Sequence, residues 1–117
     1  MQENGPAEVK SFEFSVLIIE FCGHLNNKKA FVISKQLLRS GTSIGANIQE
    51  AQYAESKKDF AHKMHIALKE ARETRYWLQL INVVGSSKKS EVKELLIKVN
   101  ELIKLLTAIV KTSKKNN

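Results

Sequence analysis

Proline occurs only once in this chain of 117 residues, at Pro6, and only five glycines accompany it. Because proline and glycine are the residues that most often end or interrupt a helix, long stretches of the chain are free to be helical. Within those stretches, apolar residues recur at spacings of three and four, the period of a helix with one buried face. No period-two stretch bounded by turn signals predicts a strand. The sequence therefore predicts an all-α fold.

Four such segments predict helices over about 6–25, 28–54, 57–84 and 88–112. Asn26, Asn27 and Gly85 are expected to form the turns between helices. Because short loops make sequential helices antiparallel, we expect an antiparallel up-and-down four-helix bundle, a single domain over 1–117. The expected core positions are Phe14, Leu17, Ile18, Phe21 and Leu25, then Leu37, Gly41, Ile44, Ile48 and Ala51, then Phe60, Met64, Ala67, Ala71, Thr74, Leu78 and Ile81, then Val92, Leu95, Leu96, Val99, Leu102, Leu106 and Ile109.

The formal charge of +7 and the pI of about 9.6 favour acidic partners such as nucleic acid, an anionic membrane or an acidic protein. Cys22 is the only cysteine, which fits a reducing compartment. The apolar run that contains Cys22 has no basic leader and is far shorter than the roughly 20 residues a membrane span needs. We therefore expect a cytoplasmic protein with no membrane contact.

A basic and aromatic stripe is predicted on the outer side of the third helix. At about 100° per residue, its members project within about 40° of the direction opposite the core. They are Lys58, His62, His65, Lys69, Arg72 and Tyr76. Such a row suits contacts with a phosphate backbone, with Tyr76 placed to stack on a base. The alternative is a solvated face that happens to be positive. Lys93, Lys104 and Lys111 form a second basic line on the fourth helix.

The second helix has a polar flank that contains Gln36, Ser40, Ser43 and Asn47 at spacings of four, three and four. Gly41 and Gly45 lie among them, although a glycine inside a helix costs about 1 kcal/mol relative to alanine. The pattern predicts a close backbone approach at the glycines. It also predicts hydrogen bonds from the polar flank to a neighbouring helix or subunit. Trp77 and Ile66 widen the apolar surface of the third helix, either inside the bundle or against another subunit.

Motifs for catalysis or for metal binding are missing from the sequence. Asp59 and His62 give one carboxylate-x-x-His pair, whereas a di-iron bundle needs two such pairs and two further glutamates. There is no GxSxG nucleophile motif, phosphate loop or dinucleotide fingerprint. None of the three arginines is followed by a histidine at the four-to-six-residue spacing of some helical-bundle ribonucleases. We therefore expect no enzyme activity, no metal and no cofactor.

Three segments together resemble the bacterial "four helix bundle protein" family. They are Gln36–Ala51 (QLLRSGTSIGANIQEA), Glu55–Phe60 (ESKKDF) and Ile66–Leu78 (IALKEARETRYWL). That family includes proteins encoded in intervening sequences of 23S rRNA genes and the accessory variability determinants of diversity-generating retroelements. The resemblance implies a homopentamer of antiparallel bundles that binds nucleic acid through a basic surface. In the retroelement members it implies a reverse transcriptase as partner.

The resemblance also marks landmark positions, which we expect to serve packing and subunit contact. They are Gln36, Arg39, Ser43, Asn47 and Glu50 in the second helix, and Lys69, Glu70, Glu73 and Trp77 in the third. Our first hypothesis is a pentameric scaffold that binds RNA or DNA through Lys58, His62, His65, Lys69 and Arg72, with Arg39 as a further candidate. Protonation of the two histidines below about pH 6.5 would strengthen this binding. The alternative is a protein–protein adaptor whose positive charge serves solubility.

Overall fold

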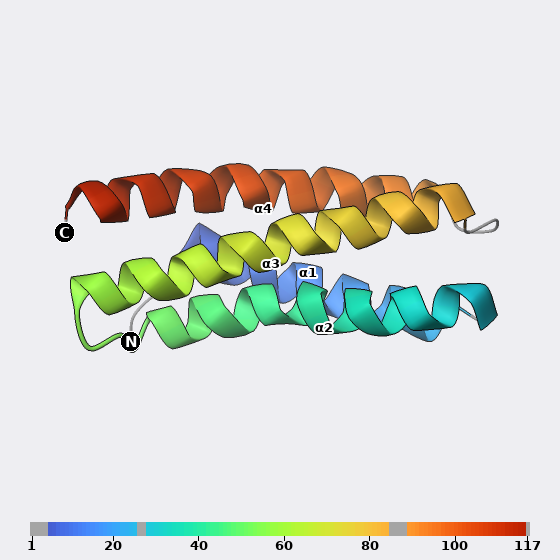
Figure 1. Ribbon diagram of the computed structural model, residues 1–117, viewed down its shortest axis with the longest axis horizontal. Helices are drawn as coiled ribbons and strands as arrows, with labels where there is room; N and C mark the ends of the chain where they lie inside the picture. Colours follow the sequence, from blue (N-terminus) through green and yellow to red (C-terminus); the bar gives the residue numbers. More distant parts are fainter. Residues whose placement is uncertain (1–4, 26–27, 85–88, 117) are drawn as a thin grey trace.

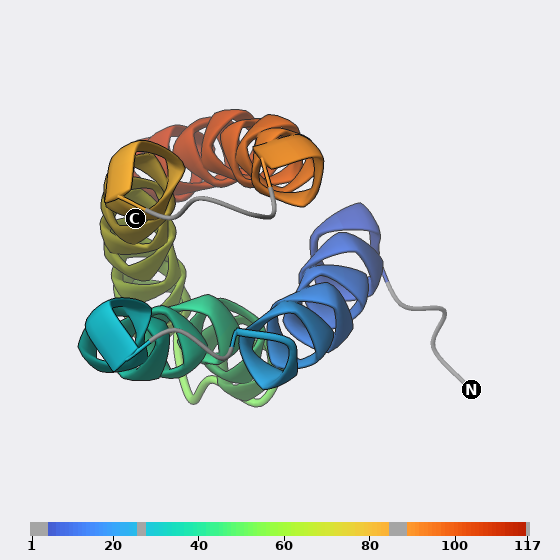
Figure 2. The same ribbon diagram turned by 90° about the vertical axis from the view of Figure 1, so that its right-hand side faces the viewer.

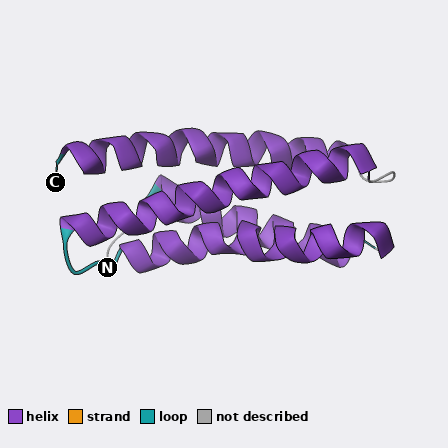
Figure 3. Ribbon diagram, in the orientation of Figure 1, coloured by secondary structure: helices purple, strands orange, loops and turns teal. Residues whose placement is uncertain are grey.

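The computed structural model describes residues 5–25, 28–84 and 89–116, and these residues form four helices. The helices are α1 (Pro6–Gly23), α2 (Lys28–Ala51), α3 (Lys57–Val84) and α4 (Lys89–Lys115). They run up and down in turn, and no strand occurs in the described ranges (Figures 1 and 3). The predicted fold class, an antiparallel four-helix bundle, is confirmed.

The helices follow one another around the bundle in chain order, so α3 lies between α2 and α4 (Figure 2). The pairing of α1 with α4, which completes the ring, is the least extensive of the four helix pairings. One ion pair crosses it, between Lys10 Nζ and Glu101 Oε2 at 3.7 Å. The outer sides of α3 and α4 are therefore neighbours, and so are those of α1 and α2.

The core follows the helical period that the sequence predicts. Ile18, Leu37, Leu78, Val99 and Leu106 are fully buried. Each such side chain contributes roughly 1.5–3 kcal/mol by leaving water. Five of the expected core residues are only half-buried, at the rim of the core: Leu17, Leu25, Phe60, Leu96 and Ile109.

Helix ends differ from the predicted ones by up to three residues. After Ala51, the N–H groups of Gln52, Tyr53 and Ala54 donate to carbonyls three residues back, at 3.0–3.2 Å, so this last turn is tighter than an α-helix. The last turn of α1 is tightened in the same way, because the N–H groups of His24 and Leu25 also donate to carbonyls three residues back. The last helix, α4, continues to Lys115. The positive charges of Lys114 and Lys115 in its last turn stabilise the negative end of the helix dipole. The turns predicted at Asn26, Asn27 and Gly85 lie outside the described residues.

Side-chain hydrogen bonds close the starts of α1 and α3. Pro6 is the first residue of α1, and the Glu8 carboxylate accepts the Gly5 N–H at 3.1 Å. Before α3, Ser56 Oγ accepts the Asp59 N–H at 3.0 Å, and the Asp59 carboxylate accepts the Glu55 N–H at 3.3 Å. The second is a capping box in which the returning bond reaches one residue further back than usual.

The glycines of α2 lie against α1, as the sequence predicts. A Cβ on Gly41 would stand 2.9 Å from Ile18 Cγ2, and one on Gly45 would stand 3.3 Å from Ser15 Oγ. The first contact involves a branched, fully buried side chain that cannot turn away. The second involves a terminal hydroxyl that can rotate. Gly41 is thus the position that sets how closely the two helices approach.

Gly41→Ala is expected to destabilise the fold by about 1 kcal/mol, whereas Gly45→Ala is expected to be neutral or stabilising. Each substitution gains about 1 kcal/mol of helix propensity. Overpacking against the core costs about 1–3 kcal/mol at Gly41, which outweighs that gain. Thermal unfolding followed by circular dichroism measures the difference. A lower midpoint for the Gly45 variant than for the Gly41 variant would contradict the assignment of the tight contact.

Candidate nucleic-acid interface

The net positive charge of the protein comes entirely from its second half. Residues 1–54 carry five basic and five acidic side chains, whereas residues 55–117 carry fourteen basic and seven acidic ones. The second half supplies α3 and α4, which lie side by side (Figures 1 and 2). The bundle is therefore neutral on the α1 and α2 side and strongly basic on the other.

The predicted stripe on α3 lies at the surface, opposite the buried Ala67, Thr74 and Leu78. Its residues Lys58, His62, Lys69, Arg72 and Tyr76 are exposed, and His65 is half-buried. Tyr76 also packs edge-on against Trp77, with ring centroids 5.2 Å apart. The exposed row leaves its cations free to meet a ligand from solvent.

A second row on α4 runs beside this stripe. Asn100, Lys104, Thr107, Lys111 and Lys114 are all exposed and follow at alternating spacings of four and three, so they share one side of the helix. Arg75 Nη1 donates to Asn100 Oδ1 at 3.2 Å, which ties this row to α3. Lys93 begins the same line, as predicted from the sequence, but Lys114 was missed there because the fourth helix was expected to end at about residue 112. We call Lys58, His62, His65, Lys69 and Arg72 of α3, with Lys104, Lys111 and Lys114 of α4, the basic face.

Four carboxylates of α3 and α4 are engaged away from the basic face. Glu70 and Glu73 contact Arg39 of α2, and Glu101 contacts Lys10 of α1. Asp59 is engaged in the cap of α3. These acidic groups therefore compensate charge on the α1 and α2 side and leave the basic face positive.

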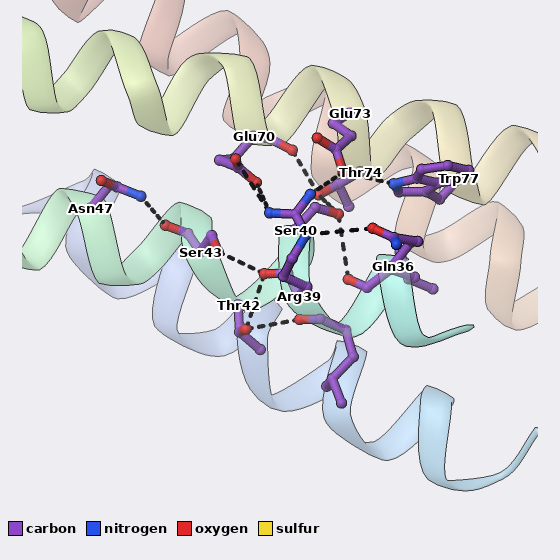
Figure 4. Close-up of polar contacts among 12 residues, drawn as sticks. Gln36, Arg39, Ser40, Thr42, Ser43, Asn47, Glu70, Glu73, Thr74 and Trp77 are labelled. Atoms are coloured by element: carbon purple, nitrogen blue, oxygen red, sulfur yellow. Dashed lines mark hydrogen bonds and ion pairs between the residues drawn. The ribbon is translucent and has the colours of Figure 1, made fainter. Parts of the chain in front are cut away.

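Arg39 is committed to the contact between α2 and α3 (Figure 4). Its Nη1 lies 3.1 Å from Glu70 Oε2, and its Nη2 donates to Glu73. The Glu73 carboxylate also accepts the Trp77 indole N–H at 2.9 Å. The hydrogen bond to Glu73 is the main cause that raises the pKa of Arg39. Two carboxylates thus neutralise Arg39, which makes it a poorer phosphate ligand than the lysines of the basic face.

The pKa of Glu73 moves the other way. Burial alone would raise it, but the hydrogen bonds from Trp77 and Arg39 outweigh burial and leave the pKa below its usual value. Glu73 therefore stays ionised and holds Arg39 and Trp77 together. Trp77 is half-buried beside the core, so this polar cluster fixes the apolar edge of α3.

The other landmark positions of α2 divide between bonds within the helix and contacts to α3. Ser43 and Asn47 donate back to carbonyls four residues earlier, at 2.7 and 2.9 Å. Glu50 pairs with Lys63 of α3 at 3.3 Å. The polar flank predicted to bond across helices does so at Ser40, whose hydroxyl accepts from buried Thr74 at 2.9 Å. Gln36 accepts from Arg39 Nε at 3.4 Å and joins the same cluster.

The side of α1 that faces away from the core is apolar, a feature that the sequence analysis missed. Val9, Phe12, Val16 and Ile19 follow at spacings of three, four and three and are 41–61% exposed. Phe12, Val16 and Ile19 border a hollow of about 400 Å³ between α1 and α2, and Gly45 also lines it. We call these four residues and the hollow the apolar face. Three more apolar side chains of α2 are exposed, and they precede the α2 residues of the hollow in the chain: Phe31, Val32 and Leu38.

Two further observations on the described ranges concern metal ligands and membrane spans. No three His, Cys, Asp or Glu residues there are grouped so that they could hold a metal ion. None of the helices is long and apolar enough to cross a membrane. Cys22 is half-buried, and burial raises the pKa of its thiol, which donates to the Ser34 carbonyl. What the described surface offers is one basic face and one apolar face.

The fold and these two faces define a small antiparallel helical bundle whose distinctive side chains lie on its surface. The profile of the 23S rRNA-intervening sequence protein family matches residues 7–108, and the chain belongs to this family. The resemblance seen in the sequence is thereby confirmed for that family.

A solved structure supports the assignment. It is the 1.70 Å crystal structure of a protein with unknown function from the S23 ribosomal protein family of Bacteroides thetaiotaomicron. The two chains are 47% identical, the alignment covers 90% of this chain and 98% of that one, and the TM-score is 0.84. No curated protein matches the chain.

Proposed function

We propose that this protein is a non-catalytic scaffold that associates with itself and binds nucleic acid through the basic face. The observation that carries the proposal is the segregation of charge. Eight basic or histidine side chains line the adjoining outer sides of α3 and α4, and the nearby carboxylates are engaged with α1, α2 or the α3 cap. A surface of this kind attracts a polyanion through its phosphates and reads sequence weakly. The family description, which refers to 23S rRNA, makes RNA the first ligand to test.

Self-association is supported by the apolar face. Four large apolar side chains on α1 lie outward in one row, and α1 also buries Phe14, Ile18 and Phe21 in the core. A helix that is apolar on both sides is typical of an element covered on both sides. The occupant that we propose is a second copy of this chain. The basic halves of two copies repel each other, whereas their neutral α1 and α2 halves can meet.

The family resemblance extends this proposal to five copies in a ring and, next to a retroelement, to a reverse transcriptase as a further partner. Five copies would repeat the basic face five times on one particle. A multivalent surface of this kind gains affinity for a long polyanion without any new contact.

Salt dependence tests the nucleic-acid part of the proposal. Each phosphate neutralised contributes about −0.7 to −0.9 to the slope of log affinity against log salt. With four or more cations engaged, RNA affinity measured by fluorescence anisotropy is expected to fall with a slope of about −3 or steeper. Absence of binding at about 50 mM salt, or binding that does not respond to salt, would favour the protein–protein adaptor instead.

A further inference from the structure

A hollow of about 410 Å³ lies where the start of α3 meets the end of α4 (Figure 1). It is lined by one aromatic ring, one cation and two small polar side chains: Phe60 and Lys57 of α3, Ser113 of α4, and Asn116 directly after α4. Phe60 is half-buried and packs against the core, so the bundle holds its ring in place. The hollow is therefore a partly apolar recess with polar groups among its lining residues.

The polar side chains of this hollow are available to a ligand. Within the described residues, the side chains of Lys57, Ser113 and Asn116 form no hydrogen bond and no ion pair. A hydroxyl and a primary amide each donate and accept, whereas an ammonium group only donates. Together these groups suit the mixed donors and acceptors along the edge of a nucleobase, with a phosphate beside it.

The hollow adjoins one end of the basic face. Lys58 and Lys114, which belong to that face, directly follow Lys57 and Ser113 of the hollow in the chain. Both of these basic-face lysines are exposed. A nucleic-acid strand whose phosphates follow the basic face would therefore reach the hollow without leaving the cations.

A second aromatic side chain lies further along the basic side of α3. Tyr76 is 54% exposed and follows Phe60 by sixteen residues, which is about 24 Å along the helix axis. Lys69 and Arg72 lie between them in the chain. Proteins that hold single strands combine such cations with aromatic side chains, on which unpaired bases stack. The bases of an A-form duplex are stacked on one another instead, so this surface favours a single strand.

We infer that the hollow between the start of α3 and the end of α4 is a base-binding subsite, which holds one unpaired base of a single-stranded RNA against Phe60. Ser113 and Asn116 bond to the edge of the base, and Lys57 bonds to the adjoining phosphate. The inference rests on the proposed function and narrows its ligand to RNA with unpaired bases. Because every base has a π-face, stacking on Phe60 selects weakly among sequences.

Phe60→Leu tests the inference, because leucine keeps an apolar side chain at the core and lacks the aromatic face. Affinity for a single-stranded RNA oligonucleotide, measured by fluorescence anisotropy, is expected to fall about fivefold or more. The salt slope is expected to stay the same, because Phe60 contacts no phosphate. Affinity for a duplex of the same sequence is also expected to stay the same. Phe31→Leu, the same change at an exposed phenylalanine of α2, is the matched control and is expected to bind both RNAs as the wild type does.

Ser113→Leu approaches the same hollow from α4 and leaves Phe60 in place. The larger side chain occupies part of the hollow, so single-stranded RNA is expected to lose affinity while the duplex does not. Circular dichroism checks that both variants remain helical. If Phe60→Leu unfolds the protein, Ser113→Leu decides the question alone, and unchanged binding of the single strand then overturns the subsite.

NMR with adenosine monophosphate separates the subsite from the scaffold proposal. The ring signals of Phe60, identified by their loss in Phe60→Leu, are expected to shift with adenosine monophosphate and not with inorganic phosphate. If the wild type and both variants bind single strands and duplexes equally, the subsite is wrong and the basic face stands. If adenosine monophosphate shifts Phe60 but neither RNA binds, the subsite stands and the nucleic-acid scaffold fails. If none of these ligands binds, both are wrong.

Discussion

Reversing two charges at the centre of the basic face, in Lys69→Glu/Arg72→Glu, is expected to lower RNA affinity about a hundredfold or more at ~0.1 M salt. Both side chains are exposed, belong to the same row and have no carboxylate partner on the described surface. Each lost phosphate contact also removes about one unit from the salt slope, so the slope should become shallower by about two. Fluorescence anisotropy across a salt series measures both quantities.

The matched control is Lys10→Glu/Lys35→Glu. It changes the net charge by the same amount, but both residues lie on α1 and α2, the neutral half of the molecule. Its affinity loss is expected to stay within about fivefold, because long-range attraction is screened beyond about 10 Å at this salt. Equal losses in the two double variants would mean that only net charge matters. Unchanged affinity in the first variant, with the assembly intact by light scattering, would reject the basic face.

The fold could be predicted from the sequence because burial in a bundle depends chiefly on helical phase. Once apolar residues recur every three or four positions, residues such as Leu78 and Val99 have only one side on which to lie. Helix ends were less predictable. Whether Gln52 and Tyr53 continue α2 or tighten its last turn depends on how the connection to α3 packs, which no local signal encodes.

Part of the candidate site could likewise be predicted from helical phase, and part of it could not. The α3 stripe follows from phase alone, because the side opposite a predicted core is the exposed one. The partners of Arg39 do not follow from it, because Glu70 and Glu73 lie more than 30 residues along the chain on another helix. Pairing them requires the axial register of α2 against α3. The role expected for Arg39 at the phosphate surface was based on its charge, and the register places that charge between two carboxylates.

The apolar face of α1 shows a different limit. Phe14, Ile18 and Phe21 were recognised as a core stripe, and Val9, Phe12, Val16 and Ile19 form a second one at equally regular spacings. A helical wheel cannot decide which of two apolar sides meets the rest of the bundle. Once the three-dimensional arrangement commits the first stripe to the core, the second is left outside, and it becomes evidence for a partner.

Under the proposed self-association, Phe12→Glu/Ile19→Glu is expected to yield monomers at micromolar concentration. The two side chains are 61% and 54% exposed, so charging them removes apolar contact from the surface without opening the core. Two carboxylates buried against a second copy would lack partners there, and an unpaired buried charge costs several kcal/mol. Multi-angle light scattering measures the mass, and circular dichroism checks that the helices remain.

Ile97→Glu is the control for this variant. Ile97 is 61% exposed, as Phe12 is, but it lies on α4 in the basic half, so this change is expected to leave the assembly intact.

The length of the RNA then distinguishes the contribution of the basic face from that of the apolar face. An oligonucleotide short enough to cover one basic face should bind the Phe12→Glu/Ile19→Glu monomer as it binds one wild-type subunit. A long RNA should lose at least about tenfold, because several faces no longer act together. A wild-type protein that is already monomeric, or a long RNA that binds both forms equally, would contradict the scaffold and leave a single bundle with one basic face.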